Sequence, residues 1–240
     1  MSATASPPSL EQRLGIGANE CPTDAQPSAE ALGLELQQLR ERAAALDAAT
    51  PMPQRLRLAL DIGHRLLDLG RQQEAWQEGW EILSQALAAE HWGEAAEACS
   101  LLYHSEQPDA IKALAHGIWL GVTYPINPEL SVALLQSLVE ETPDNSDGGA
   151  VAAATACYLA DLRSEGQQRE NLLFFTQRLL AEVARRHSKV QEQEVFDFWV
   201  ERMGLNDPGK FLPRLAKVLD ILTGGDWWYD RDALRARLPE

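Results

Sequence analysis

Apolar residues recur at spacings of three and four along nearly the whole chain after residue 30, and this periodicity constrains the fold more than any other feature. The first such stripe is formed by Leu32, Leu36, Leu39, Ala43 and Leu46. Residues at these spacings lie on one face of a helix. No stretch shows the alternation of β-branched residues between turns that is typical of strands. The pattern therefore predicts helices throughout and no β-sheet.

Prolines, glycines and capping residues divide the pattern into segments of roughly 12 to 20 residues joined by short turns. Such segments pack most simply as antiparallel hairpins stacked side by side. We therefore expect an all-α fold, either an irregular α-solenoid or a bundle of antiparallel helical hairpins. After the first stripe, the expected helices are 54–69, 73–88, 92–107, 110–121, 128–141, 150–162, 167–187, 191–203, 213–222 and 231–238.

Residues 1–30 are rich in Ser, Pro, Ala, Gln and Gly and lack a periodic apolar face. A segment of this composition buries too little apolar surface to offset the entropy of ordering it, so we expect a disordered tail there. The alternative is a short docking peptide around Leu10–Leu14. A polar loop at residues 142–149 then separates a helical-hairpin region at 31–142 from a C-terminal helical region at 147–240, packed on it as one continuous domain.

Within residues 58–76, the pair Ile62-Gly63 is followed by Leu66, Gly70 and Ala75. This order resembles about one unit of a tetratricopeptide repeat, in which a Leu-Gly pair and a tyrosine on the first helix precede an inter-helix glycine and a second-helix alanine. The resemblance implies a helical hairpin whose small residues let the two helices approach closely.

A second fragment, Trp92–Ala95, looks like the start of the second helix of such a unit. It ends only 20 residues after Ala75, whereas the family's period is about 34 residues. The spacing therefore predicts an irregular array of hairpins.

The chain holds 21 Lys and Arg residues against 36 Asp and Glu residues, a formal net charge of −15. This charge repels nucleic acid and anionic membranes, so we expect neither as a partner. The most apolar window, residues 111–135, contains charged residues and prolines that are costly in hydrocarbon, which argues against a membrane span. The three cysteines are well separated, which predicts no disulfide framework and fits a cytoplasmic location.

Residues able to perform catalysis or hold a metal are scattered. The five histidines form no pair at the spacing of metal ligands, and we expect them at the surface or at helix ends. No glycine-rich phosphate-binding motif is present. The acidic loop from Asp144 to Gly149 does not match a calcium-binding loop, because Thr155 stands where a bidentate glutamate is needed. We therefore expect no catalytic residue, no cofactor and no metal.

Residues 148–157 are small almost throughout, from Gly148-Gly149 to Cys157. This composition is typical of a buried central helix that its neighbours cross closely. The alternative is the floor of a pocket between helices, which would make the chain an enzyme or a small-ligand-binding regulator.

One aromatic cluster lies within the expected helix 191–203. Phe196 and Trp199 are three residues apart and share a face, while Phe198 points elsewhere. Large aromatic side chains dominate the energetics of protein interfaces. We therefore take Phe196 and Trp199 as candidate contacts to a partner protein.

A second aromatic cluster, Trp227, Trp228 and Tyr229, follows the double glycine Gly224-Gly225. Three adjacent aromatic residues outside a helix do not all point inward with ease. We expect one tryptophan to be buried and the other to be largely exposed, so that the cluster also contacts a partner.

A short basic stretch near the end of the helix expected at 167–187 could dock an acidic partner, although cations at a helix C-terminus are also common as a solvated face. Its residues are Arg178, Arg185, Arg186 and Lys189. Together these features favour a non-catalytic protein-interaction module. Such a chain would be an adaptor or a dedicated assembly chaperone that holds a partner subunit in a groove between helical hairpins.

Overall fold

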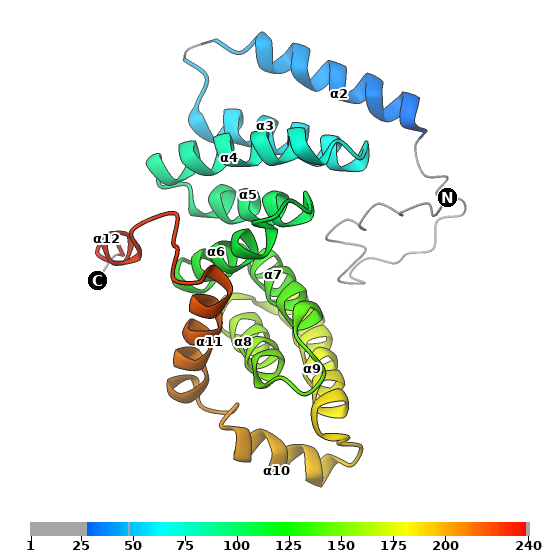
Figure 1. Cartoon of the computed structure of the whole chain (residues 1–240), viewed down its shortest axis with the longest axis vertical. Coiled ribbons are helices and arrows are strands. Elements are labelled where there is room, and N and C mark those ends of the chain that lie inside the picture. The colour runs from blue at the N-terminus through cyan, green and yellow to red at the C-terminus, as the bar shows by residue number, and fades with distance from the viewer. Residues whose placement is uncertain (1–27, 48, 239–240) are drawn as a thin grey trace. The chain divides into compact units, whose positions relative to one another are not determined.

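The computed structural model describes residues 28–47 and 49–238, and in these residues the fold is all-α, without a strand (Figure 1). The all-α prediction is therefore confirmed. The helices are α2 (Ala29–Ala44), α3 (Met52–Asp68), α4 (Gln72–Ala88), α5 (Trp92–His104), α6 (Ala110–Thr123), α7 (Pro128–Glu141), α8 (Asp147–Arg163), α9 (Gly166–Ser188), α10 (Gln193–Met203), α11 (Pro208–Thr223) and α12 (Arg231–Arg235).

Helices α2 and α11 begin earlier than the sequence predicts. Helix α2 begins at Ala29, inside the predicted tail, because the Ser28 hydroxyl caps it by accepting the Ala31 amide at 3.2 Å. The rest of that tail, with the docking peptide considered at Leu10–Leu14, lies outside the described residues. Helix α11 begins at Pro208 instead of Pro213, because Asp207 caps it and a proline is well tolerated in the first helical turn.

The chain divides into two compact units, one reaching to Ala113 and the other starting at Leu114. The loop at 142–149 lies inside the second unit, where it joins α7 to α8. Helices α2 to α5 in the first unit and α7 to α9 in the second pack on their neighbours in the chain, as in an array of helical hairpins.

In the first unit, the repeating element is one helix with the turn that follows it. Helices α3, α4 and α5 begin at Met52, Gln72 and Trp92, which are 20 residues apart. The two turns between them pass through a left-handed residue, Gly70 with φ 69° and Glu90 with φ 60°. The amide after each donates to a carbonyl five residues earlier, at 2.8 Å in the first turn and 2.9 Å in the second. The 20-residue spacing in the sequence is therefore the length of one helix with its turn.

The small residues of the first unit let three helices pack closely. A side chain at Gly63 on α3 would collide with Leu101 on α5, and a Cβ at Gly79 on α4 would lie 2.9 Å from Leu102. Ala75 has no exposed surface. Helix α4 therefore packs against both α3 and α5, and α3 also reaches α5.

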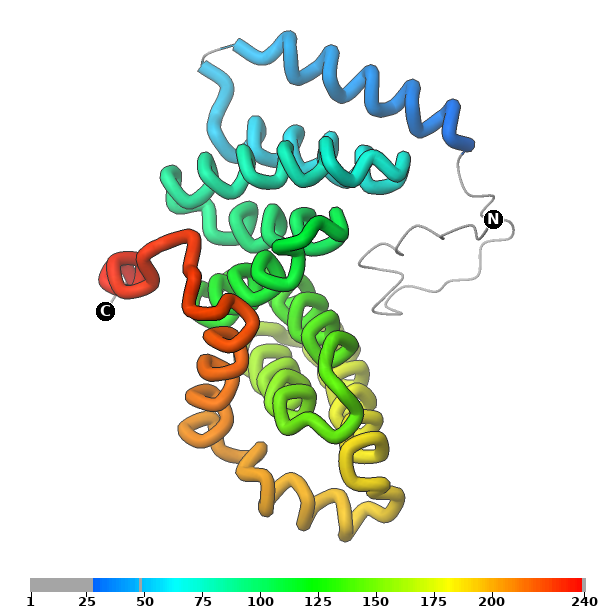
Figure 2. Tube along the Cα trace, in the orientation of Figure 1, coloured from blue at the N-terminus to red at the C-terminus, as the bar shows by residue number. Residues whose placement is uncertain are grey.

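In the second unit α8 is the central helix, with α7, α9 and α11 packed around it (Figure 2). Residues Gly148 to Ala156 are all buried. A Cβ at Gly149 would lie 2.7 Å from Thr142 Oγ1 and 2.8 Å from Arg186 Nη2. The small residues of α8 thus serve close helix packing.

Arg163 and Arg186 each cap the C-terminal end of a helix in this unit. Arg163, at the end of α8, donates to the carbonyls of Gly121 and Val122 at the end of α6. Arg186, near the end of α9, donates to the Val139 carbonyl of α7 at 2.6 Å. Each arginine satisfies carbonyls that a helix end leaves without an intrahelical partner.

Candidate functional site

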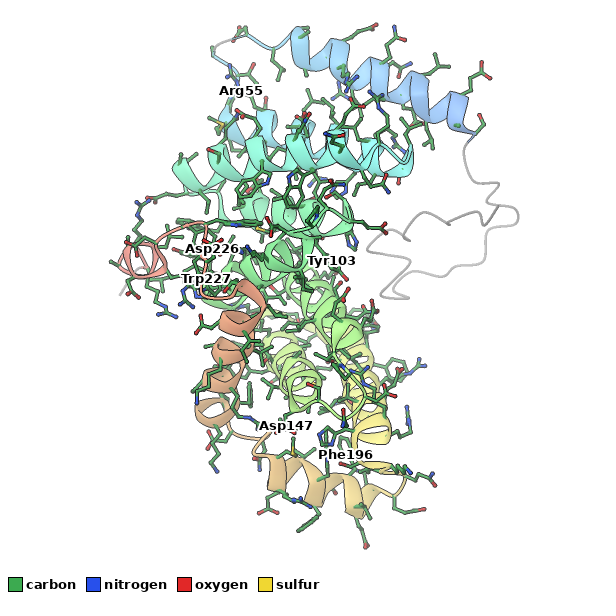
Figure 3. The ribbon with its side chains drawn as sticks, viewed as in Figure 1. Arg55, Tyr103, Asp147, Phe196, Asp226 and Trp227 are labelled. Atoms are coloured by element: carbon green, nitrogen blue, oxygen red, sulfur yellow. The ribbon has the colours of Figure 1, made fainter. Side chains whose placement is uncertain are left out.

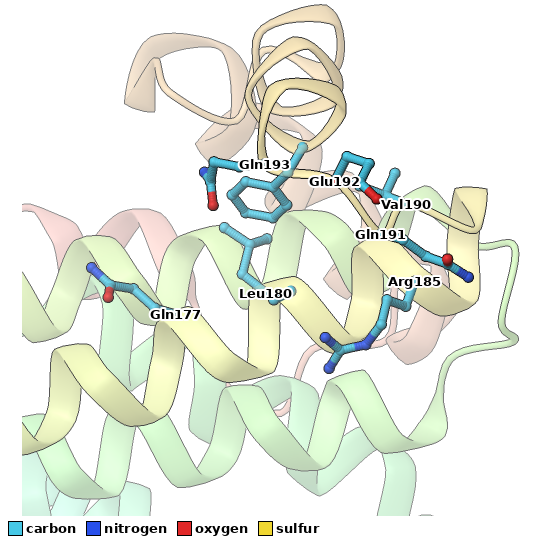
Figure 4. A pocket seen from close by; sticks show the side chains of 9 residues that line it. Gln177, Leu180, Arg185, Val190, Gln191, Glu192 and Gln193 are labelled. Atoms are coloured by element: carbon cyan, nitrogen blue, oxygen red, sulfur yellow. The ribbon is translucent and has the colours of Figure 1, made fainter.

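A groove of about 490 Å³ opens between α9 and α10 (Figure 4). Its apolar part is formed by Leu180 and Ala181 of α9, Val190 of the linker and Phe196 of α10. Figure 4 shows the Leu180 side chain pointing from α9 toward α10. The groove has the size of a typical ligand or peptide-anchor pocket.

Polar side chains surround the apolar part of the groove. Three are amides, Gln177, Gln191 and Gln193, and two are charged, Arg185 and Glu192. Amide side chains both donate and accept hydrogen bonds, so they can satisfy the backbone of a bound segment. The groove thus combines apolar anchoring with polar groups that are not specific for one ligand.

The groove exists because the chain turns sharply after α9. Lys189 is left-handed with φ 54°, and its amide donates to the Arg185 carbonyl at 2.9 Å. Val190 is buried, and its amide donates to the Ala184 carbonyl at 3.4 Å. These contacts fix the linker against the end of α9, so that α10 begins beside α9 instead of continuing it.

Trp199 anchors α10 to the rest of the unit. Its side chain is 5% exposed, and its ring lies 5.8 Å from that of His187 and 6.1 Å from that of Phe196. Phe196 is half-buried at the groove, whereas Phe198 is 63% exposed. The prediction that Phe196 and Trp199 share a face and Phe198 points elsewhere is confirmed. Trp199 therefore positions the helix, and Phe196 presents a surface.

Asp147, at the start of α8, ties this end of the second unit together (Figure 3). One carboxylate oxygen lies 3.1 Å from His187 Nε2 of α9, and the other accepts from Arg214 Nη2 of α11 at 3.0 Å. Arg214 also donates to the Met203 carbonyl at the end of α10, at 2.6 Å. The frame around the groove is thus held by α8, α9 and α11 together.

Large apolar side chains stand in solvent on both helices of the groove. Phe174 is 65% exposed and shares a face of α9 with Gln177 and Ala181, at spacings of three and four. On α10, Phe198 and Val195 are exposed as well. Exposed aromatic groups beside a groove are a mark of interaction surfaces.

The second predicted cluster, Trp227, Trp228 and Tyr229, is docked on α6 around His116. The Trp228 amide donates to His116 Nε2 at 2.9 Å, and the two rings stack at 4.1 Å. The Tyr229 hydroxyl donates to the His116 carbonyl at 2.9 Å. His116 itself has no exposed surface. The aromatic segment is therefore held by hydrogen bonds as well as by ring contacts.

The expectation of one buried and one exposed tryptophan is wrong, because Trp227 and Trp228 are both half-buried. Trp227 donates from Nε1 to Asp220 at 3.0 Å, and the Arg231 guanidinium lies 4.0 Å above its ring. The expectation of surface or helix-end histidines also fails for His116. The His116 ring contacts all three residues of the aromatic segment. Each of these three residues keeps part of its surface in solvent.

The small-residue stretch of α8 is filled by its neighbours, as described above. Burial raises the pKa of the Cys157 thiol at its end to about 11, so that this thiol stays protonated at neutral pH. Among the described residues, no group of three or more His, Cys, Asp and Glu side chains could hold a metal ion. In the same part of the chain, no helix is long and apolar enough to cross a membrane.

No protein-family model matches the chain, and neither the curated proteins nor the solved structures include a significant match. The successive packing of helices is compatible with a helical-hairpin repeat, but no comparison assigns the chain to the tetratricopeptide family.

Proposed function

We propose that the chain is a non-catalytic protein-interaction module, an adaptor or a dedicated assembly chaperone. It holds a helix or an extended segment of a partner subunit in the groove between α9 and α10. The observation that supports this proposal is the groove lined by Leu180, Val190 and Phe196. The 65% exposed ring of Phe174 lies on the same face of α9 as the groove residues Gln177 and Ala181.

The energetics of the groove suit a protein segment. Burying apolar surface stabilises a complex by about 25 cal/mol per Å², and aromatic residues in desolvated pockets give the largest share of interface energy. Phe196 already lies half-buried at the groove, so a partner side chain completes its burial. The glutamine amides then pair with the partner's backbone, which would otherwise be left unsatisfied.

The proposal is tested by affinity capture from the native extract with three forms of the full chain. These are the unmodified chain, Phe196→Glu and the matched control Ile221→Glu, which changes a 78% exposed residue on α11 outside the groove. The unmodified chain and the control should retain the same partner, identified by mass spectrometry, and Phe196→Glu should lose it. Equal capture by all three forms, with unchanged circular dichroism, rules out the groove as the binding site.

A further inference from the structure

Helix α9 has an outer stripe on the side that does not pack on α7 and α8. The residues of this stripe follow at spacings of four, seven and four, so that they share one face of the helix. They are Glu170, Phe174, Ala181 and Arg185. Three of them are exposed, and Ala181 is half-buried in the wall of the groove. The outer stripe therefore continues the α9 side of the groove along the helix surface.

The spacing of the outer stripe is the same in both directions of the helix, whereas its chemistry is reversed. The stripe has an acid at its N-terminal end and a base at its C-terminal end, and between them a large ring precedes a small side chain. A second α9 that lies antiparallel, centred between residues 177 and 178, places Glu170 opposite the second copy's Arg185. It also places Phe174 opposite the second copy's Ala181. A two-fold axis repeats both contacts, so the stripe is complementary to itself.

The α9 side of the groove offers space for the Phe174 ring of a second copy. Ala181 lies between Gln177, Leu180 and Arg185, which together form this side of the groove. Because alanine is small, it leaves room for a ring at the centre of these four residues. The Phe174 ring is 65% exposed in the single chain, so the contact removes apolar surface from water. Aromatic side chains buried in this way give the largest share of interface energy.

The charges of the outer stripe are available to a second copy. Neither Glu170 nor Arg185 forms an ion pair with another described residue. Arg178 lies over the Phe174 ring at 5.6 Å, close to the centre of the stripe, where it faces its own counterpart. The repulsion between these two arginines is offset by Glu182, which lies one turn further along the helix.

The net charge of α9 also favours it as the contact between two copies. The whole chain has a formal net charge of −15, so two copies repel each other over most of their surface. Helix α9 holds four arginines against two glutamates. Two copies that meet along α9 therefore avoid the repulsion that their acidic surfaces would cause.

We propose that two copies of the chain form a symmetric dimer in which their α9 helices pack antiparallel. The Phe174 ring of each copy lies against the α9 side of the other copy's groove, and Glu170 pairs with Arg185 across the interface. This inference rests on the proposed function, because it takes the groove as a binding site for a protein helix and names that helix. Another protein that uses the groove must first displace the second copy.

Sedimentation velocity over a range of chain concentrations tests the dimer. The unmodified full chain should dimerise as its concentration rises, and Phe174→Glu should raise the dissociation constant about a hundredfold, because both copies lose a central aromatic contact. The matched control is Ile221→Glu, which adds the same charge at a 78% exposed apolar residue of α11. It should leave the dissociation constant unchanged.

The pairing of Glu170 with Arg185 is tested by mixing two charge variants. Glu170→Arg alone and Arg185→Glu alone place like charges opposite each other twice, so each should dimerise at least about tenfold more weakly than the unmodified chain. In an equimolar mixture of the two variants, every arginine at these positions faces a glutamate. The mixture should therefore form a heterodimer with about the affinity of the unmodified chain. This recovery also shows that both variants are folded.

The inference and the proposed function fail in different ways. A dimer that survives Phe174→Glu, or a mixture that does not recover, overturns the antiparallel α9 interface. A chain that stays monomeric at every concentration also overturns it, and it leaves the proposed function standing if partner capture still depends on Phe196. A monomeric chain whose partner capture does not depend on Phe196 overturns both.

Discussion

The aromatic segment Trp227–Tyr229 and the α9–α10 groove are both rich in aromatic side chains, yet the two regions use them differently. In the aromatic segment each ring has a specific partner, including His116, Asp220 and Arg231. At the groove, Phe174 and Phe198 are mostly in solvent. Aromatic rings in a hydrogen-bonded network stabilise the fold, whereas rings left beside a groove are available to a partner.

The charges follow the same division. In the first unit, Arg57 pairs with Asp61 and Glu97, and His64 also reaches Glu97 at 3.2 Å. At the groove, the charged residues Arg185 and Glu192 are exposed and form no ion pair with a described residue. Paired charges hold helices to each other, and exposed charges at a groove can orient a ligand. Under the proposed function, the residues that hold the fold together and those that bind a partner therefore differ.

The strongest test of this contrast is to replace His116, the residue that contacts all three rings of the aromatic segment. His116→Ala leaves a cavity among three rings and an unpaired Trp228 amide, so it should cost about 3–5 kcal/mol of unfolding free energy. Phe196→Ala at the half-exposed groove should cost about 1 kcal/mol. Urea unfolding followed by circular dichroism measures both. A similar loss for the two variants would show that the groove is as much part of the core as the aromatic segment.

The next largest loss of unfolding free energy is expected for a substitution in the packing around α8. Gly149→Ala places a methyl group against Thr142 and Arg186 and disturbs the cap of α7, so it should destabilise the fold by about 1–3 kcal/mol. The matched control is Gly93→Ala on α5, where nothing lies within 4 Å of the added atom. There, replacing a helical glycine should stabilise the chain by up to about 1 kcal/mol. If Gly149→Ala leaves the free energy of unfolding unchanged, there is open space beside α8. That result would support the alternative of a ligand pocket between these helices.

The paired charges of the first unit should make its stability acid-sensitive. Burial by itself raises the pKa of the Glu97 carboxyl, but the hydrogen bond from His64 and the charge of Arg57 outweigh it and hold the pKa below the ordinary 4.5. A carboxyl with a lowered pKa in the folded state stabilises the fold above the unfolded-state pKa. That stabilisation is lost as the pH falls through the folded-state pKa.

Glu97→Gln should therefore cost about 1.5 kcal/mol at pH 7, and less as the pH falls below 4.5, the ordinary value for this carboxyl. Glu194→Gln on α10 should change stability by less than about 0.5 kcal/mol, as expected for an exposed surface charge. Thermal unfolding at a series of pH values compares the two. A pH-independent cost for Glu97→Gln would mean that its ion pairs contribute nothing beyond packing.

The sequence predicts the helices well because their apolar spacing and their caps are local. Phe196 and Trp199 could be placed on one face for the same reason. His116 could not be placed, because a lone histidine in an apolar helix has no local partner, and its acceptor role depends on an amide 112 residues away. The sequence does contain one indication that His116 is buried. It lies among the apolar residues Leu114, Ala115 and Ile118, all of which are buried in the structure.

The groove was also beyond sequence reasoning. It depends on the angle at which α10 leaves α9, which the left-handed Lys189 and the buried Val190 set together. One hint lay in the run Leu172-Leu173-Phe174-Phe175, because four consecutive apolar residues spread over more than one helix face. At least one of them must then leave the core, and in the structure it is Phe174.

The smallest effect on stability is expected at the exposed rings themselves. Phe198→Ser and Phe174→Ser each remove a side chain that is about two-thirds exposed, so each should change the unfolding free energy by less than about 0.5 kcal/mol. Their effect on partner capture should be larger than their effect on stability, because a partner buries these rings that the fold leaves in solvent. The Ile221→Ser variant removes an apolar group that is more exposed still, at 78%, and lies away from the groove, so it should change neither quantity. If all three serine variants retain the partner equally, the exposed phenylalanines are ordinary surface residues, and the contrast between the two aromatic regions is one of packing alone.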